Sequence, residues 1–202
     1  MPNLNTEEIK KLKKGELAGF IAAGLAGAVL VALGVLLIIA VVREDGDLRL
    51  CAMLLCLPVG VFSLVAAICN LKYGRAIDRI IKNYVRDVFL ENAALMHPER
   101  DSLTYYISND GREFSIKANN FKERIIFDFS AFGKLSLVRR SSIMTAIIER
   151  LEWTYCRLYE RGGTYKSVSY AAIKDGKQGK TFNIIENGEP DKKAYKDYKK
   201  QR

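Results

Sequence analysis

The sequence predicts a membrane protein in which an N-terminal two-helix transmembrane hairpin is followed by a small α+β cytoplasmic domain. Three observations carry this prediction. Residues 17–42 contain no charged side chain, and residues 50–71 form a second apolar run without one. Each run reaches the length of about 20 apolar residues that a membrane-spanning helix needs. From residue 102 onward, short segments with alternating apolar side chains indicate β-strands instead. The length of the uncharged runs argues against the alternative, a buried pair of water-soluble helices.

The chain then divides into six predicted segments. They are a basic cytoplasmic N-terminal segment (1–16), the first transmembrane helix (17–42), a short extracytoplasmic turn (43–49), the second transmembrane helix (50–71), the cytoplasmic α+β domain (74–190) and a basic, disordered tail (191–202). Thr6 is a candidate cap for a short amphipathic helix within the first segment. The alternative is that its lysines serve only to orient the hairpin.

Basic residues flank both apolar runs at the ends away from the turn. Because Lys and Arg concentrate on the cytoplasmic side of a membrane, this pattern predicts a protein integral to the cell membrane with both termini cytoplasmic. The net charge of +9 favours attraction to anionic lipid rather than to nucleic acid. The predicted lipid contacts are Lys10, Lys11, Lys13, Lys14, Lys72, Arg75 and Arg79.

Small residues recur at intervals of three or four in both runs, which lets two helix backbones approach closely. The predicted helix-packing residues are Gly19, Ala23, Gly27, Gly60, Ser63 and Ala67. A second small face at Ala18, Ala22 and Ala26 leaves homo-oligomerisation open. Pro58 is expected to bend the second helix.

The first half of the domain is predicted as one helix and three or four antiparallel strands. Gly74 permits a bend before a helix over 75–95, whose apolar stripe covers a sheet or lies on a membrane surface. Asp110-Gly111 forms the tight turn of a hairpin between strands at 102–109 and 112–118. A third strand covers 124–130, and 134–138 is a candidate fourth.

A second helix and two more strands complete the predicted domain. Ser141 or Ser142 caps a helix that runs to about Glu160, and glycines 162 and 163 end it. The strands cover 164–174 and 180–186, with a loop between them. Trp153, the only tryptophan, is either a core-edge residue or an anchor for a partner.

The sequence shows no catalytic motif. The single histidine, His97, stands without a nearby ligand set, Asp128 has no carboxylate partner, and Glu149 and Glu152 have the spacing of a solvated helix face. The four cysteines form no CxxC pattern and are expected to be reduced apolar fillers. We therefore expect no catalytic residue, no cofactor and no metal site.

These observations lead to the hypothesis of a non-enzymatic, membrane-anchored interaction or regulatory protein that presents its α+β domain at the inner leaflet. Membrane lipids and a protein partner or a second copy are the expected partners, and no nucleic acid is expected. The alternatives are a small oligomeric pore or accessory subunit of a membrane transport complex, and a membrane-associated enzyme without a recognisable motif.

Overall fold

The structure is a computed structural model that describes residues 4–43, 48–96, 102–119, 121–174 and 176–201. Within the first two helices, it describes the side chains of residues 6–29, 58, 59, 61, 62, 65, 66 and 72–91. The chain forms two compact units. The first consists of Met1–Thr6 and Arg79–Arg202, and the second of Glu7–Asp78. We call them the sheet unit and the helical unit.

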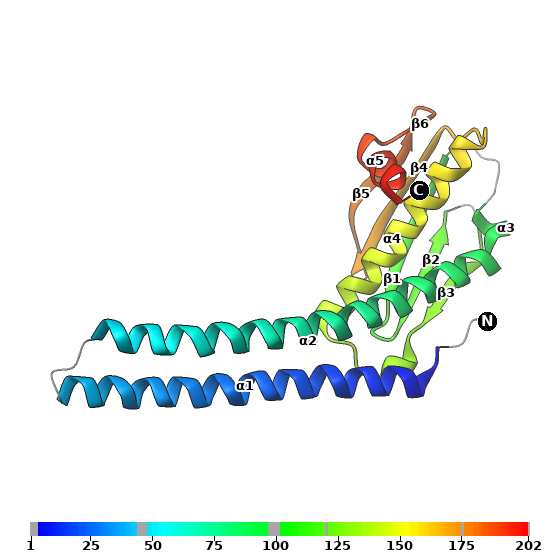
Figure 1. The fold of residues 1–202 in the computed structure, drawn as a ribbon. Coiled ribbons are helices and arrows are strands. Elements are labelled where there is room, and N and C mark those ends of the chain that lie inside the picture. The colour runs from blue at the N-terminus through cyan, green and yellow to red at the C-terminus, as the bar shows by residue number, and fades with distance from the viewer. Residues whose placement is uncertain (1–3, 44–47, 97–101, 120, 175, 202) are drawn as a thin grey trace. The chain divides into compact units, whose positions relative to one another are not determined.

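The helical unit is built from α1 (Thr6–Arg43) and the first part of α2 (Leu48–Glu91). Figure 1 shows the two helices side by side in antiparallel orientation. They approach closely at Gly15, where a Cβ built on the glycine would lie 2.6 Å from Cε1 of Tyr73. Glycine at this position therefore leaves room for the aromatic ring of the opposite helix.

The prediction of a membrane protein with two transmembrane helices is wrong. Over the residues that the structure describes, no helix has a stretch both long enough and apolar enough to cross a membrane. The predicted spans at 17–42 and 50–71, the extracytoplasmic turn and the location in the cell membrane are corrected accordingly.

The helix expected at 75–95 is not a separate element. α2 continues through Pro58 and Gly74 to Glu91, and the four-residue helix α3 (Ala93–Met96) follows. A glycine inside a helix costs only about 1 kcal/mol relative to alanine, which the hydrogen bonds of the flanking turns offset. The predicted apolar stripe of this segment consists of Ile77, Ile80, Ile81, Tyr84 and Val88. It is confirmed, because Ile80 is half-buried and the other four side chains are buried.

The sheet unit contains one mixed sheet of six strands in the order β3-β2-β1-β4-β5-β6. The strands are β1 (Ser102–Asn109), β2 (Glu113–Ala118), β3 (Arg124–Asp128), β4 (Ser167–Lys174), β5 (Lys177–Glu186) and β6 (Glu189–Pro190). β1 pairs in parallel with β4, and the other neighbours are antiparallel. The predicted antiparallel pairing of the first three strands is confirmed. The parallel pairing of β1 with β4 was not predicted, and it arises because a helix joins β3 to β4 and returns the chain in the direction of β1.

That connecting helix, α4 (Leu137–Glu160), begins four residues earlier than its first predicted cap. The Ser136 side chain accepts a hydrogen bond from the backbone N–H of Arg139 and serves as the cap. The candidate strand at 134–138 is therefore wrong. The short 3-10 helix η1 (Ser130–Phe132) links β3 to this region.

α4 and the end of α2 cover one face of the sheet (Figure 1). From α2, Tyr84 and Phe89 make ring contacts with Phe129 and Phe127, the latter in β3. From α4, Tyr155 contacts Tyr105 of β1, and their buried hydroxyl groups are hydrogen-bonded to each other. The core of the unit therefore lies between the two helices and this face.

The last helix, α5 (Lys192–Gln201), replaces the disordered tail expected at 191–202. The Asp191 carboxylate caps it by accepting hydrogen bonds from the backbone N–H groups of Lys193 and Ala194, at 2.9 and 3.1 Å. Ala194 and Tyr198 are buried. The tail is thus ordered because its few apolar side chains pack against the rest of the sheet unit.

Candidate functional site

Helix α5 is fixed on α4 by an aromatic cluster and a shared carboxylate. Tyr195 and Tyr198 both donate hydroxyl hydrogen bonds to Glu160, at 3.1 and 2.9 Å. Their rings stack on each other, and Ala194 and Tyr198 pack against buried Cys156. Burial raises the pKa of the Cys156 thiol to about 12, so the thiol is protonated and held as an apolar filler.

Trp153 lies next to this cluster on the exposed side of α4. Its ring contacts that of Tyr198 at a centroid distance of 6.0 Å. The guanidinium groups of Arg150 and Arg157 lie over the indole, 4.2 and 4.9 Å from the ring centroid. Because the arginines hold the indole while leaving it partly exposed, Trp153 forms a rigid aromatic feature at the surface.

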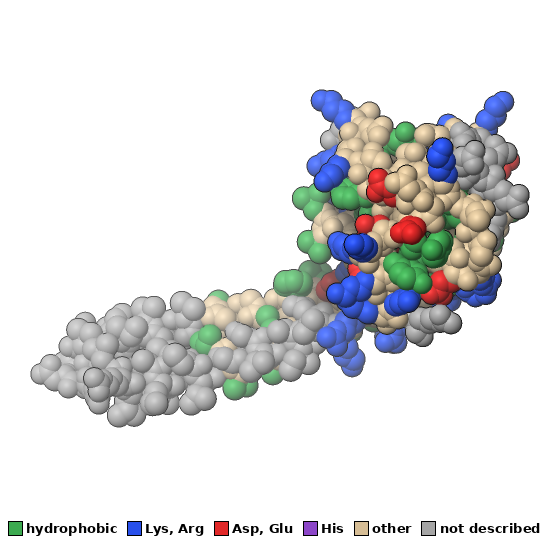
Figure 2. Space-filling model, turned by 90° about the horizontal axis from the view of Figure 1, so that it is seen from above, with side chains coloured by type: hydrophobic (Ala, Val, Ile, Leu, Met, Phe, Trp, Pro, Cys, Tyr) green, Lys and Arg blue, Asp and Glu red, His purple; other side chains and the backbone are tan. Residues whose placement is uncertain are grey.

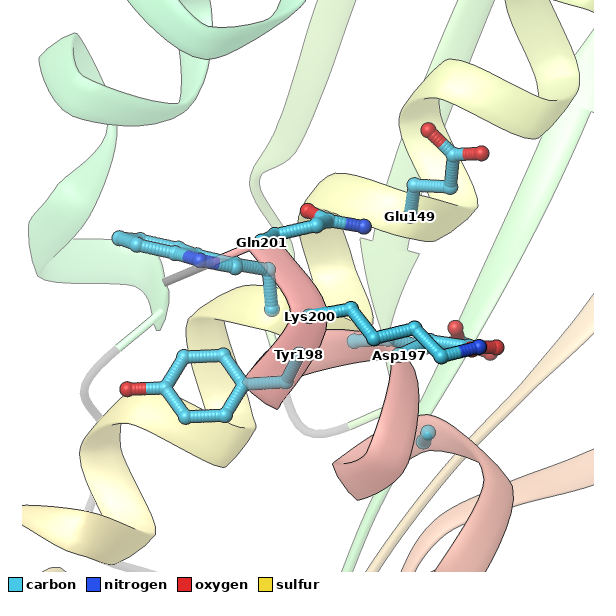
Figure 3. A pocket seen from close by; sticks show the side chains of 8 residues that line it. Glu149, Asp197, Tyr198, Lys200 and Gln201 are labelled. Atoms are coloured by element: carbon cyan, nitrogen blue, oxygen red, sulfur yellow. The ribbon is translucent and has the colours of Figure 1, made fainter.

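Two adjoining concavities flank Trp153, and we call them the acidic and the basic concavity. The acidic concavity, of about 300 Å³, lies between α4 and α5. In Figure 3, Glu149 extends from α4, whereas Asp197, Tyr198, Lys200 and Gln201 extend from α5. The basic concavity, of about 310 Å³, lies between α2 and α4. Glu149, Trp153 and Gln201 line both.

In the acidic concavity, the charged groups already have partners within the protein. Lys200 lies 3.5 Å from Asp197. Glu152 accepts a hydrogen bond of 3.2 Å from the Tyr170 hydroxyl. Burial raises the pKa of Glu152, and hydrogen bonding to Tyr170 only partly opposes this effect.

In the basic concavity, positive side chains predominate. Lys82 forms a salt bridge of 2.8 Å with Glu149, and Arg86 forms one of 2.9 Å with Asp87. Burial lowers the pKa of Arg150, and the charges of Arg86 and Arg157 lower it further. On the face shown in Figure 2, Lys and Arg side chains lie mainly toward the edges of the sheet unit, with Asp and Glu between them.

Of the residues considered for catalysis, the structure brings Glu149 and Glu152 to this site. Asp128, at the end of β3, is exposed, and its carboxylate accepts a hydrogen bond from the backbone N–H of Ser130. His97 lies outside the described residues. Among the residues that are described, no group of three His, Cys, Asp or Glu side chains could hold a metal ion.

The residues predicted to contact lipid all belong to the helices of the N-terminal part. Lys10, Lys11, Lys14, Lys72, Arg75 and Arg79 are exposed, and Lys13 is half-buried. None of them lines either concavity. Their proposed role rested on the membrane location that the structure does not support.

The residues predicted to pack the two helices are only partly described. Gly19 and Ala23 are half-buried, whereas Gly27 is exposed with nothing within 4 Å of a Cβ built on it. The side chains of Ser63 and Ala67, and the surroundings of Gly60, lie outside the described residues, as do Cys51, Cys56 and Cys69.

The contribution of α5 to the site was not predicted from the sequence. Tyr198, Lys200 and Gln201 were assigned to a disordered tail because the segment is rich in lysine. The missed signal is Asp191 as a helix cap after Pro190, followed by Ala194, Tyr195 and Tyr198 at helical spacing.

Comparisons of this chain with protein-family models, with curated proteins and with solved structures found no match. The function of the protein is therefore inferred from the geometry of the site.

Proposed function

We propose that the sheet unit is a non-enzymatic protein-interaction domain and that the surface around Trp153 binds a segment of a partner protein. The observation that carries this proposal is the partly exposed Trp153, held by two arginines between two concavities. Tryptophan, tyrosine and arginine are the residues that contribute most often to binding energy at protein interfaces. Trp153, Tyr198 and Arg150 supply all three types at one place.

The partners of the charged groups favour binding over catalysis. A catalytic acid or base needs access to a substrate proton. Here Glu149 is engaged by Lys82, Asp197 by Lys200, and Glu152 by Tyr170. These contacts hold the rim of the site in place, as a preformed binding surface requires.

Site-specific cross-linking in the full chain tests this proposal. A photoreactive amino acid replaces Gln201, an exposed residue that lines both concavities. We expect it to capture a partner protein that is then purified and binds the unlabelled chain in a titration. Trp153→Ala should weaken that binding at least tenfold, about 1.4 kcal/mol, because it removes the anchor.

Phe182→Ala is the matched control, since Phe182 is an aromatic residue exposed to 48% that lines neither concavity. Its affinity for the partner should stay within a factor of two of the unmodified chain. Circular dichroism establishes that each variant is folded. Equal affinities of a folded Trp153→Ala variant and the unmodified chain would refute the proposal.

A further inference from the structure

The basic concavity combines a defined volume with an excess of positive charge. Its lining comes from α2, α4 and the end of α5, with the polar amides of Asn83 and Gln201 beside the charged groups. The volume of about 310 Å³ is at the lower end of the range for small-ligand pockets, roughly 300–1,000 Å³. It therefore suits a compact group rather than a large molecule.

Three cations, Lys82, Arg86 and Arg150, and one carboxylate, Glu149, line this concavity. Glu149 is paired with Lys82. Beyond the lining, Asp87 is paired with Arg86, and Arg157 lies over the same indole ring as Arg150. Two positive charges therefore remain uncompensated among these six groups.

Arg150 has a buried Nε without a hydrogen-bond partner among the described residues. Burial lowers the pKa of Arg150, and repulsion from the nearby charges of Arg86 and Arg157 lowers it further. A bound anion would relieve that repulsion and accept the unused hydrogen bond.

We propose that the basic concavity binds a phosphate dianion, free or as a phosphoryl group, through Arg86 and Arg150. A dianion matches the two uncompensated positive charges, and the guanidinium fork matches the oxygen spacing of phosphate. The inference rests on the proposed function, because it assigns a ligand chemistry to one half of the same surface.

Isothermal titration of the full chain tests this inference. The probes are inorganic phosphate, O-phosphoserine, sulfate and acetate, at constant ionic strength because surface electrostatics are screened by salt. Phosphate and O-phosphoserine should bind, and acetate should bind at least tenfold more weakly because it carries half the charge. O-phosphoserine binding tighter than inorganic phosphate identifies a phosphoryl group as the ligand, and equal or weaker binding identifies free phosphate. Sulfate, also a dianion, should bind more tightly than acetate.

Two variants locate the site. Arg150→Gln and Arg86→Gln should each weaken phosphate binding at least tenfold, whereas Arg112→Gln, at an exposed residue outside the concavity, should change it less than twofold. Arg86→Gln keeps the test decisive if Arg150→Gln does not fold, because the Arg86 side chain is 50% exposed.

Each remaining outcome has a fixed meaning. Absence of phosphate and O-phosphoserine binding at millimolar concentrations overturns the inference. It is also overturned if acetate binds as tightly as phosphate, or if the Arg86→Gln variant binds phosphate as tightly as the unmodified chain. If the captured partner still binds the unmodified chain more tightly than the Trp153→Ala variant in that case, the proposed function stands and only the phosphate site is lost. Phosphate binding without any Trp153-dependent partner overturns the proposed function alone.

Discussion

Phe127 in β3 and Phe20 in α1 are the same side chain in opposite surroundings. Phe127 is 0% exposed in the sheet unit, whereas Phe20 is 62% exposed in the helical unit. The difference is general, since Leu17, Ile21, Leu25 and Val29 of α1 are also exposed, whereas Leu103, Ile107, Ile116 and Ile125 of the sheet are buried. The two units therefore use similar residues with very different energetic results.

The reason lies in how many neighbours each architecture supplies. A strand in the sheet has a partner on one or both edges and helices over one face, so its inward side chains are enclosed. A helix in a two-helix unit meets a single neighbour along one stripe, and the rest of its circumference stays uncovered. Apolar composition alone thus does not reveal whether a side chain contributes to a core.

The largest expected effect on stability comes from replacing the two phenylalanines, one in each unit, by alanine. Phe127→Ala should lower the free energy of unfolding by about 3–5 kcal/mol, because it leaves a cavity in the core. Phe20→Ala should change it by less than about 0.5 kcal/mol, since an exposed ring loses few contacts. Urea unfolding, followed by Trp153 fluorescence and by far-ultraviolet circular dichroism, measures both variants. A cost for Phe20→Ala equal to that of Phe127→Ala would show that Phe20 is enclosed.

A second prediction sharpens the description of the sheet-unit core. Tyr155→Phe should destabilise the chain by about 1–3 kcal/mol, because it leaves the buried Tyr105 hydroxyl without its partner. Burial raises the pKa of Tyr105 to about 12, so its hydroxyl keeps its proton and needs that partner up to high pH. The double variant Tyr105→Phe/Tyr155→Phe should recover most of the loss. Tyr106→Phe, at a half-buried neighbour in β1, is the control, and its effect should stay within about 0.5 kcal/mol. A double variant as unstable as Tyr155→Phe would contradict the pairing.

The smallest expected effect concerns the helical unit. Gly27→Ala should stabilise α1 by about 0.5–1 kcal/mol, because alanine has the higher helix propensity and the added Cβ meets no described atom within 4 Å. Gly15→Ala should stabilise α1 less than Gly27→Ala does, or should destabilise it, since the added Cβ would lie 2.6 Å from the Tyr73 ring. Thermal unfolding measured by circular dichroism compares the two. In a Tyr73→Ala background, Gly15→Ala should regain the benefit seen for Gly27→Ala, and an unchanged penalty there would exclude the Tyr73 contact as its cause.

Local patterns predicted much of the sheet unit. The first strand was predicted with the observed bounds, and the alternation of Ile125, Phe127 and Phe129 gave their buried face, because a strand places every second side chain on the same side. The predicted turn at Asp110-Gly111 is confirmed by the pairing of β1 with β2 and by the positive φ of Gly111. Patterns over a few residues suffice for such features, since they depend on neighbours in sequence.

The candidate site was only partly accessible from the sequence. Trp153 was recognised as either a core-edge residue or a partner anchor, and Glu149 and Glu152 as members of one helix face. Neither assignment showed that α2 brings Lys82 and Arg86 to the same concavity. Those residues lie more than sixty positions from Arg150 in the chain, and no local periodicity relates them.

The amino-acid sequence by itself determined which strand segments of the sheet unit carry alternating apolar side chains, where the turn of the first hairpin lies and which helix faces are apolar. These features depend on backbone sterics and side-chain periodicity, which act between near neighbours in the chain. The tertiary structure decided that β1 and β4 lie parallel, that α5 is ordered against Cys156, and that the apolar side chains Leu17, Phe20, Ile21, Leu25 and Val29 of α1 are exposed. These properties depend on which surfaces meet after folding. The free energy of each contact exists only once segments distant in sequence have been brought together.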